Sequence, residues 1–307
     1  PGMDRHTALG FRDKPIMKAR LVGSGVRVPR FGRADSVAGV LKAAEEIGYP
    51  VVIKPVSGAG TADTWRVDDE AQARAKLATM AHVPEVSVEE FIEGSEFTYD
   101  AVTIDGKPVF ESVTQYHPPP LQMRTLEWVS PAQLTLRDPY IPATQCGIAL
   151  GRQVLEALHM GTGFVHMEWF KNRRGEAVFG EIACRSGGGK LMDALDFAND
   201  IDIYREWARA VCWHAFDAVP QRKYHVVTVF KRALGQGRIT RIEGLEAVRR
   251  RCGPGLVVED LLPVGHPRRN WKQTLLSDGY VTMRSIDYRD VCEMRDVAVN
   301  SLRMYAE

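Results

Sequence analysis

Residues 163–190 read GFVHMEWFKNRRGEAVFGEIACRSGGGK, and this stretch carries the strongest fold signal in the chain. Two apolar runs flank a four-residue turn at residues 173–176, which predicts a β-hairpin. Because facing residues in an antiparallel pair keep a constant sum of residue numbers, one pair fixes the others. The facing pairs that this register predicts are Asn172 with Ala177, Phe170 with Phe179, and Glu168 with Glu181.

Two glutamates that face each other in this way have β-carbons about 4.5–5.5 Å apart, where like charges destabilise a sheet. A divalent cation between Glu168 and Glu181 would remove the repulsion. Magnesium suits this position, since it prefers oxygen ligands, takes few carboxylates and completes its shell with waters and substrate phosphates. The alternative is that both carboxylates face water. Apolar neighbours on the same face favour the metal, because uncompensated charge there is costly; this face carries Phe164, His166, Phe170, Phe179 and Arg185.

A second candidate element lies upstream, where Lys54 interrupts the apolar strand PVVIKPV and precedes the small-residue loop of residues 57–61. The backbone of such a loop can approach an anion closely, so phosphate binding is one interpretation. The other is an ordinary turn beside a lysine that extends to solvent. The loop lacks the Walker signature, so it is not a P-loop. Lys18 lies in a predicted helix of residues 13–22 and by itself would be a solvated surface lysine.

The acidic run of residues 89–96 joins two different patterns of secondary structure and could be a hinge that binds a ligand. Before it, helices alternate with strands, which predicts a small α/β lobe. After it, strands separated by short turns predict an antiparallel sheet. Further along we predict an irregular loop over the proline-rich residues 117–134 and one helix over residues 190–216.

Composition restricts the class of protein. Lys and Arg total 40 against 39 Asp and Glu, so no bulk electrostatic argument for nucleic acid binding remains, and runs such as 249–251 are typical of solvated surface. The five cysteines form no CxxC pair, which indicates reduced thiols rather than zinc or disulfides. We find no secretory segment and no apolar stretch of membrane-spanning length, so cytoplasm is the expected compartment.

Five motifs in order resemble those of the ATP-grasp superfamily, especially its carboxylate–amine ligases that act on amino acids and peptides. They are RDKPIMK, VVIKPVSGAGT, VEEFIEGSE, FVHMEW and GEIACRSGGG. The resemblance implies an α+β ATP-grasp fold, with ATP between two α+β lobes and a C-terminal lobe like that of biotin carboxylase. The expected division is a small lobe at residues 23–90 and a large lobe at residues 91–307, with a C-terminal subdomain from about residue 221.

The resemblance also implies site roles. ATP phosphates would contact Lys18 and Lys54, and ribose would contact Glu96. Glu168 and Glu181 would bind the metal, and Arg185 would steady the phosphate or acyl phosphate. The mobile flap would be Ser57, Gly58, Gly60 and Thr61, the adenine site would be Glu89, Glu90, Phe91 and Ile92, and the substrate loop would be Gly187, Gly188 and Gly189.

The sequence departs from the family pattern in two ways. Family members commonly carry an asparagine where this chain has Ala183, and they begin with a further α/β domain, of which residues 1–22 would be the last linker and helix. In the predicted register His166 faces Ala183. Its imidazole could orient a metal-bound water, or it could be packed and hydrogen-bonded.

The function implied is that of an ADP-forming ligase, which uses ATP with magnesium, or manganese in its place, to convert a carboxylate to an acyl phosphate that an amine then attacks. Small-molecule acids and amines are the expected partners, without nucleic acid or membrane, and a homodimer is one option. The alternatives are a relative that activates bicarbonate for carboxylation or carbamoyl formation, and an ATP-binding scaffold without turnover, which Ala183 would favour.

Overall fold

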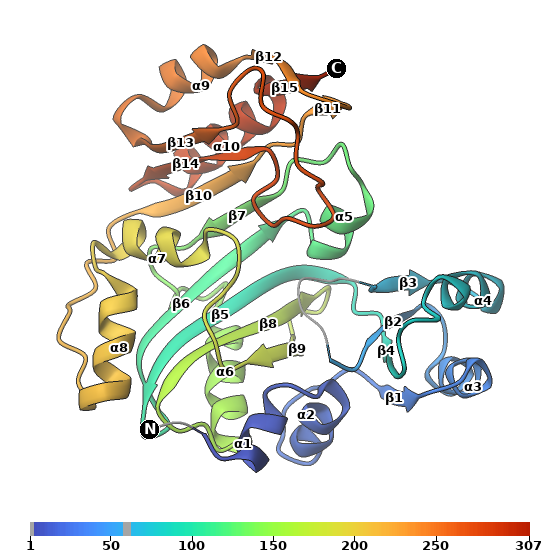
Figure 1. Ribbon diagram of the computed structural model, residues 1–307. Coiled ribbons are helices and arrows are strands. Elements are labelled where there is room, and N and C mark those ends of the chain that lie inside the picture. The colour runs from blue at the N-terminus through green and yellow to red at the C-terminus, as the bar shows by residue number, and fades with distance from the viewer. Residues whose placement is uncertain (1–2, 58–62) are drawn as a thin grey trace. The chain divides into compact units, whose positions relative to one another are not determined.

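The computed structural model describes residues 3–57 and 63–307 of the chain (Figure 1). The chain divides into two compact units. The first contains residues 1–111, 140–185 and 210–214, and the second contains residues 112–139, 186–209 and 215–307. The lobes predicted at residues 23–90 and 91–307 are not these units, and that division stays a prediction. No helix in the described part of the chain combines the length and the apolar character that crossing a bilayer requires.

The first half of unit 1 is a four-stranded sheet with helices packed on an apolar core. Its strands follow the order β1-β4-β2-β3, and all the pairs are antiparallel. Asp4, Asp13, Ser36 and Asp69 cap the four helices, since each side chain accepts a hydrogen bond from a backbone N–H of the first turn. The elements are α1 (Arg5–Gly10), α2 (Lys14–Leu21), β1 (Phe31–Ala34), α3 (Val37–Ile47), β2 (Val51–Pro55), β3 (Trp65–Val67), α4 (Glu70–Thr79) and β4 (Val86–Glu90).

The second half of unit 1 places one helix against three antiparallel strands. These are β5 (Gly94–Ile104), β8 (Gly163–Asn172) and β9 (Ala177–Ala183), in the order β5-β8-β9, with α6 (Gln145–Ala157) packed on them. Two glycines one turn apart let α6 approach closely. A β-carbon at Gly147 would lie 2.0 Å from the Trp169 ring, and one at Gly151 would lie 2.7 Å from the Tyr99 ring.

The β8–β9 hairpin has the predicted facing glutamates but not the whole predicted register. Glu168 faces Glu181, as expected, whereas Trp169 rather than Phe170 faces Phe179, and Lys171 rather than Asn172 faces Ala177. The register shifts after Glu168 because Gly180 is an extra residue on β9, which makes a β-bulge. A β-carbon at Gly180 would lie 2.7 Å from the Glu168 carbonyl oxygen, so only glycine fits there without rearrangement.

Unit 2 contains the rest of the chain. Strand β6 (Lys107–His117) begins in unit 1 and ends in unit 2. Its strands follow the orders β13-β14-β10-β7-β6 and β11-β15-β12. The predicted single helix of residues 190–216 is wrong: two helices form, because Asp200 between them has a left-handed backbone with φ of 51°. The predicted irregular loop also contains a short helix and a strand. The elements are α5 (Pro120–Thr125), β7 (Ala132–Thr135), α7 (Leu191–Asn199), α8 (Ile203–Trp213, which ends in unit 1), β10 (His225–Phe230), β11 (Leu234–Gly235), β12 (Ile239–Glu243), α9 (Leu245–Cys252), β13 (Leu256–Leu261), β14 (Gly279–Ser285), α10 (Tyr288–Ser301) and β15 (Arg303–Ala306).

Candidate active site

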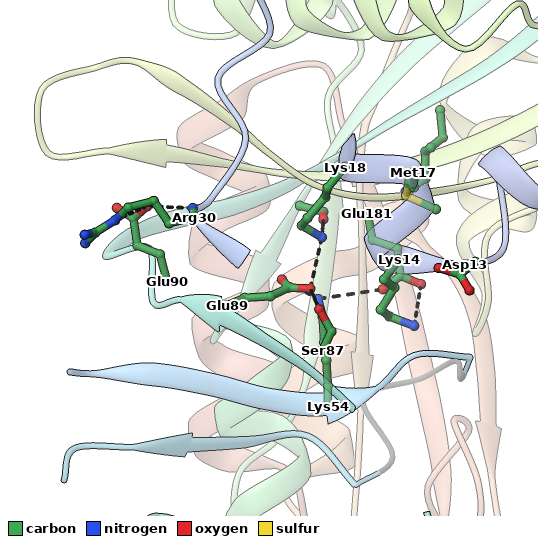
Figure 2. Close-up of polar contacts among 12 residues, drawn as sticks. Asp13, Lys14, Met17, Lys18, Arg30, Lys54, Ser87, Glu89, Glu90 and Glu181 are labelled. Atoms are coloured by element: carbon green, nitrogen blue, oxygen red, sulfur yellow. Dashed lines mark hydrogen bonds and ion pairs between the residues drawn. The ribbon is translucent and has the colours of Figure 1, made fainter. Parts of the chain in front are cut away.

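A buried carboxylate joins the two predicted phosphate-binding lysines in unit 1 (Figure 2). The Glu89 carboxylate on β4 lies 3.1 Å from Lys18 Nζ on α2 and 2.9 Å from Lys54 Nζ on β2. It also accepts a hydrogen bond of 2.8 Å from Ser87 Oγ. Burial opposes the charge, but the two ammonium groups outweigh it and lower the pKa of Glu89 to about 2. Glu89 is therefore ionised at neutral pH.

The two lysines differ in exposure. Lys18 has no exposed surface, and its ammonium also donates to the Gly180 carbonyl at 2.9 Å, so the bulge supplies an acceptor to the helix. Burial lowers the pKa of Lys18 to about 8, although Glu89 partly offsets the shift. Lys54 keeps 14% of its side chain exposed. Burial also opposes its charge, but Glu89 and Glu181 outweigh that cost and raise the pKa of Lys54 above its usual value.

Local sequence explains how these groups meet. Lys14 and Lys18 are four residues apart on α2, so both lie on one helix face. The Met17 sulfur between them accepts a hydrogen bond of 3.4 Å from the Ile182 N–H, which holds α2 against β9. Lys54 faces Ser87 across the β2–β4 pair, two residues from Glu89 on the same side of the strand.

The facing glutamates lie next to the lysines, and their charge is incompletely compensated. Lys14 Nζ lies 3.4 Å from Glu181, and Lys54 Nζ lies 4.0 Å from it (Figure 2). Glu168 has a raised pKa because it is desolvated, with the Glu181 charge adding to the effect. The predicted ribose ligand Glu96 is buried, and desolvation together with the nearby Glu168 charge raises its pKa well above the usual value. Glu168 and Glu181 nevertheless expose 31% and 27% of their side chains, so a ligand can reach them.

This donor set suits a magnesium ion that is shared with a nucleotide. Hard carboxylate oxygens are supplied by Glu168 and Glu181, which face each other directly. Within the described residues, no group of three or more His, Cys, Asp and Glu side chains is arranged to hold a metal. Two carboxylates leave most of an octahedral shell to waters and phosphate oxygens, which is the usual arrangement for magnesium at a phosphoryl-transfer site.

The other residues of the predicted adenine segment lie in more exposed positions. The Glu90 carboxylate accepts hydrogen bonds from Arg27 Nη2 at 2.8 Å and from the Arg30 N–H at 3.0 Å. The Phe91 ring lies under the Arg66 guanidinium at 4.4 Å, and its N–H donates to the Pro50 carbonyl. Ile92 is half-buried. The adenine role of residues 89–92 stays a prediction.

The remaining predicted site residues belong to the flap, to Arg185 and to the substrate loop, and not all of them lie in the described part of the chain. Ser57 is exposed, whereas Gly58, Gly60 and Thr61 lie outside the described residues. Arg185 is exposed at the end of unit 1, and its charge opposes the rise in the pKa of Glu168. Gly187, Gly188 and Gly189 belong to unit 2, where Gly189 has a φ of 66° and a β-carbon on it would meet Gln133 and Phe230.

Sequence reasoning missed Lys14 and the partner of His166. Lys14 carried a usable signal, because its spacing from Lys18 places both on one helix face. Asp100, whose carboxylate lies 2.8 Å from His166 Nδ1, carried none, since 66 residues separate the two. His166 is buried and hydrogen-bonded, as one of the two interpretations of this residue expected.

Comparison with known proteins gives consistent results. Residues 47–193 match the model of a family described as the ATP-grasp domain. An L-arginine-specific L-amino acid ligase from Bacillus subtilis is 27% identical over 212 residues, which cover 66% of this chain and 50% of that protein. A D-alanine--D-alanine ligase from Clostridium perfringens is 37% identical over 97 residues, 31% of this chain and 32% of that enzyme. This chain therefore spans half or less of the length of these two relatives.

Among solved structures, the L-amino acid ligase from Bacillus licheniformis superposes on this chain with a TM-score of 0.80 and 19% sequence identity. The superposition covers all of this chain and 75% of that structure. At this level of identity the likeness establishes the fold, and it confirms the α+β architecture expected from the five motifs.

Proposed function

We propose that this chain activates a carboxylate with ATP and joins it to an amine. The basis is the match of residues 47–193 to the ATP-grasp domain and the fold shared with an L-amino acid ligase. The carboxylate oxygen attacks the γ-phosphorus, the bond to the β-phosphate oxygen breaks, and an acyl phosphate and ADP result. The amine nitrogen then attacks the acyl carbon, loses a proton and displaces phosphate. The observation that carries the proposal is the facing pair of Glu168 and Glu181 next to charged Lys54.

ATP-grasp ligases use ATP with a divalent metal, and Glu168 and Glu181 would hold that metal here, with magnesium favoured and manganese a substitute. When bound, it would neutralise charge on the phosphate oxygens. Glu168 has a raised pKa, so a cation beside it would also relieve an unfavourable arrangement in the protein itself.

Lys54 is the lysine best placed to bind phosphate, because it stays charged and keeps part of its surface accessible. Lys18 is fully buried and would act mainly through its field and by holding Glu89. Arg185 would add positive charge where charge builds up on the transferred phosphoryl group. No covalent protein nucleophile is needed, since the substrate carboxylate is the nucleophile.

Amino acids are the substrate class that we propose for both the acid and the amine. The support is the likeness to an enzyme named as an L-arginine-specific L-amino acid ligase.

The test is to incubate the protein with ATP, magnesium and pooled amino acids, and to identify products by mass spectrometry while ADP release is followed. We expect amino-acid-dependent ADP release and a peptide product, both lost in Glu181→Gln, whose side chain has the same size. ATP binding without ADP release for any acid and amine would instead identify a scaffold. Undiminished amino-acid-dependent ADP release by Glu181→Gln would contradict the metal assignment.

A further inference from the structure

Strands β5, β8 and β9 lie side by side in unit 1 (Figure 1). Five polar side chains and one alanine form two rows on one face of these strands, which we call the polar grid. Thr98 on β5 faces Glu168 on β8, and Glu168 faces Glu181 on β9. Two residues further along the strands, the next row faces in the same way and consists of Asp100, His166 and Ala183. Because side chains alternate along a strand, both rows lie on the same face.

The grid fixes the His166 ring. The Asp100 side chain has no exposed surface, and its two oxygens have separate partners: Thr98 Oγ1 donates to one at 2.5 Å, and His166 Nδ1 lies 2.8 Å from the other. Because a carboxylate only accepts, Nδ1 is the protonated nitrogen in this contact. Ring orientation and tautomer are therefore both set by Asp100, as in the carboxylate–histidine arrangements that support metal ligands.

The other ring nitrogen faces a proposed metal ligand. His166 Nε2 lies 3.9 Å from Glu168 Oε1, and His166 is itself 5% exposed. On the opposite side its cross-strand neighbour is Ala183, whose single methyl group leaves the imidazole room. A larger side chain at position 183 would compete for that space, since facing β-carbons are only about 4.5–5.5 Å apart.

We propose that Asp100 and His166, supported by Thr98, are positioning residues that hold Glu168 in the conformation that binds the metal–nucleotide complex. This inference rests on the proposed function, because it assigns a role to residues behind one of its metal ligands. The role requires a fixed ring beside Glu168 and not a particular charge on it. In this role Asp100 and His166 act through Glu168 and need no contact of their own with nucleotide or substrate.

The test measures binding of the non-hydrolysable ATP analogue AMPPNP by calorimetry, once with magnesium and once with EDTA, so that turnover plays no part. We expect Asp100→Asn and His166→Gln to weaken binding in magnesium by about 10-fold or more, the usual effect of removing a residue behind a metal ligand. Binding in EDTA should match that of wild type, since the variants leave Lys54, the proposed phosphate ligand, in place.

The mildest variant and a matched control separate positioning from general loss of stability. Thr98→Val removes only the hydroxyl that donates to Asp100, so it should produce a smaller loss of the same kind even if the other variants fold poorly. Thr228→Val removes an equally buried hydroxyl in unit 2, where Thr228 Oγ1 lies 3.0 Å from Thr282 Oγ1, and should leave both affinities unchanged.

Two results would overturn the inference while the proposed function stands. One is an unchanged gain in affinity from magnesium in both Asp100→Asn and His166→Gln. The other is an equal loss with magnesium and with EDTA, which would mean that these residues support the fold in general. If the wild-type protein bound no AMPPNP in either condition, the proposed function would fail and the inference with it.

Discussion

Two groups of carboxylates in unit 1 differ in how well their surroundings compensate their charge. Glu111 accepts hydrogen bonds from Tyr99 at 2.8 Å and Tyr140 at 3.0 Å, and Arg152 binds both of its oxygens. These partners outweigh the cost of burial, and the pKa of Glu111 is lowered. At Glu168 and Glu181 the carboxylates face each other instead, and the pKa of Glu168 is raised.

Desolvation of an acid therefore does not by itself indicate a functional site. In the Glu111 cluster (Glu111, Tyr99, Tyr140 and Arg152), each carboxylate oxygen accepts two hydrogen bonds, so the charge is compensated without a ligand. The Glu168–Glu181 pair is partly exposed, and the nearby lysines compensate its charge only incompletely, which is an arrangement that costs stability until a cation binds. Incomplete compensation next to accessible surface is the more informative sign.

The largest expected effect is on turnover. Glu168→Gln should reduce amino-acid-dependent ADP release by about 10³-fold, because it removes charge that holds the cation over the transferred phosphoryl group. Its free energy of unfolding at pH 7 should stay the same or rise slightly, since the charge that it removes is unfavourable in the folded protein. Steady-state kinetics and urea unfolding measure the two quantities. If the variant lost activity only because it unfolded, the metal-binding role assigned to Glu168 would lose its support.

The next effect concerns stability. Glu89→Gln leaves two lysines without their shared carboxylate, and Lys18 is fully buried, so the free energy of unfolding should fall by about 3–5 kcal/mol. Urea denaturation at pH 7 checks this value. Glu85→Gln is the matched control, because it removes an exposed ion pair with Arg33 and should cost less than about 1 kcal/mol. Equal losses in the two variants would contradict the importance assigned to burial.

Glu111→Gln should destabilise the fold by about 1–3 kcal/mol, because it weakens charge-assisted hydrogen bonds in a buried position. In contrast with Glu168→Gln, it should leave the magnesium-dependent affinity for AMPPNP unchanged. Unfolding and calorimetry on the same preparation give both values. A large loss of affinity for AMPPNP would show that the Glu111 cluster also contributes to nucleotide binding.

The smallest effect is a difference in pH dependence. The folded-state pKa of Glu111 lies below its unfolded value near 4.5, so its ionised form contributes stability above that pH and loses the contribution as pH falls through the folded pKa. The stability difference between wild type and Glu111→Gln should therefore shrink below about pH 4.5. Chemical denaturation from pH 7 to pH 3 measures it. A difference that grew on acidification would have the wrong sign.

Several residues of the candidate site could be predicted from the sequence, but the correct pairing of Glu168 with Glu181 was predicted from a partly incorrect hairpin register. The Glu168–Glu181 pair was predicted from a regular hairpin, whereas the actual hairpin pairs Lys171 with Ala177 and restores the expected pairing only through the bulge at Gly180. A one-residue error in the turn was cancelled by one extra residue in the strand. Gly180 gave a signal that could have been used, because a glycine inside a strand often marks a bulge.

The sequence did not predict which residues far apart in the chain would contact each other. Lys18 was predicted as a phosphate ligand from a motif, yet its ammonium is fully buried and donates to an oxygen 162 residues away. The break between α7 and α8 depends on the left-handed backbone of Asp200, and the apolar periodicity on either side did not indicate it.

The sequence alone indicated the helix of residues 13–22, the strand that contains Lys54, the ATP-grasp motifs and a hairpin that carries Glu168 and Glu181 on neighbouring strands, because these depend on local periodicity and short connections. Helix α1 and strand β3 were not predicted, and the exact pairing of the two glutamates depended on the bulge at Gly180. Tertiary packing brings Glu89 between Lys18 and Lys54, and it brings Asp100 against the His166 ring beside Glu168. These contacts join strands and helices far apart in the chain. Their charges and burial are set by packing, which no local pattern of residues encodes.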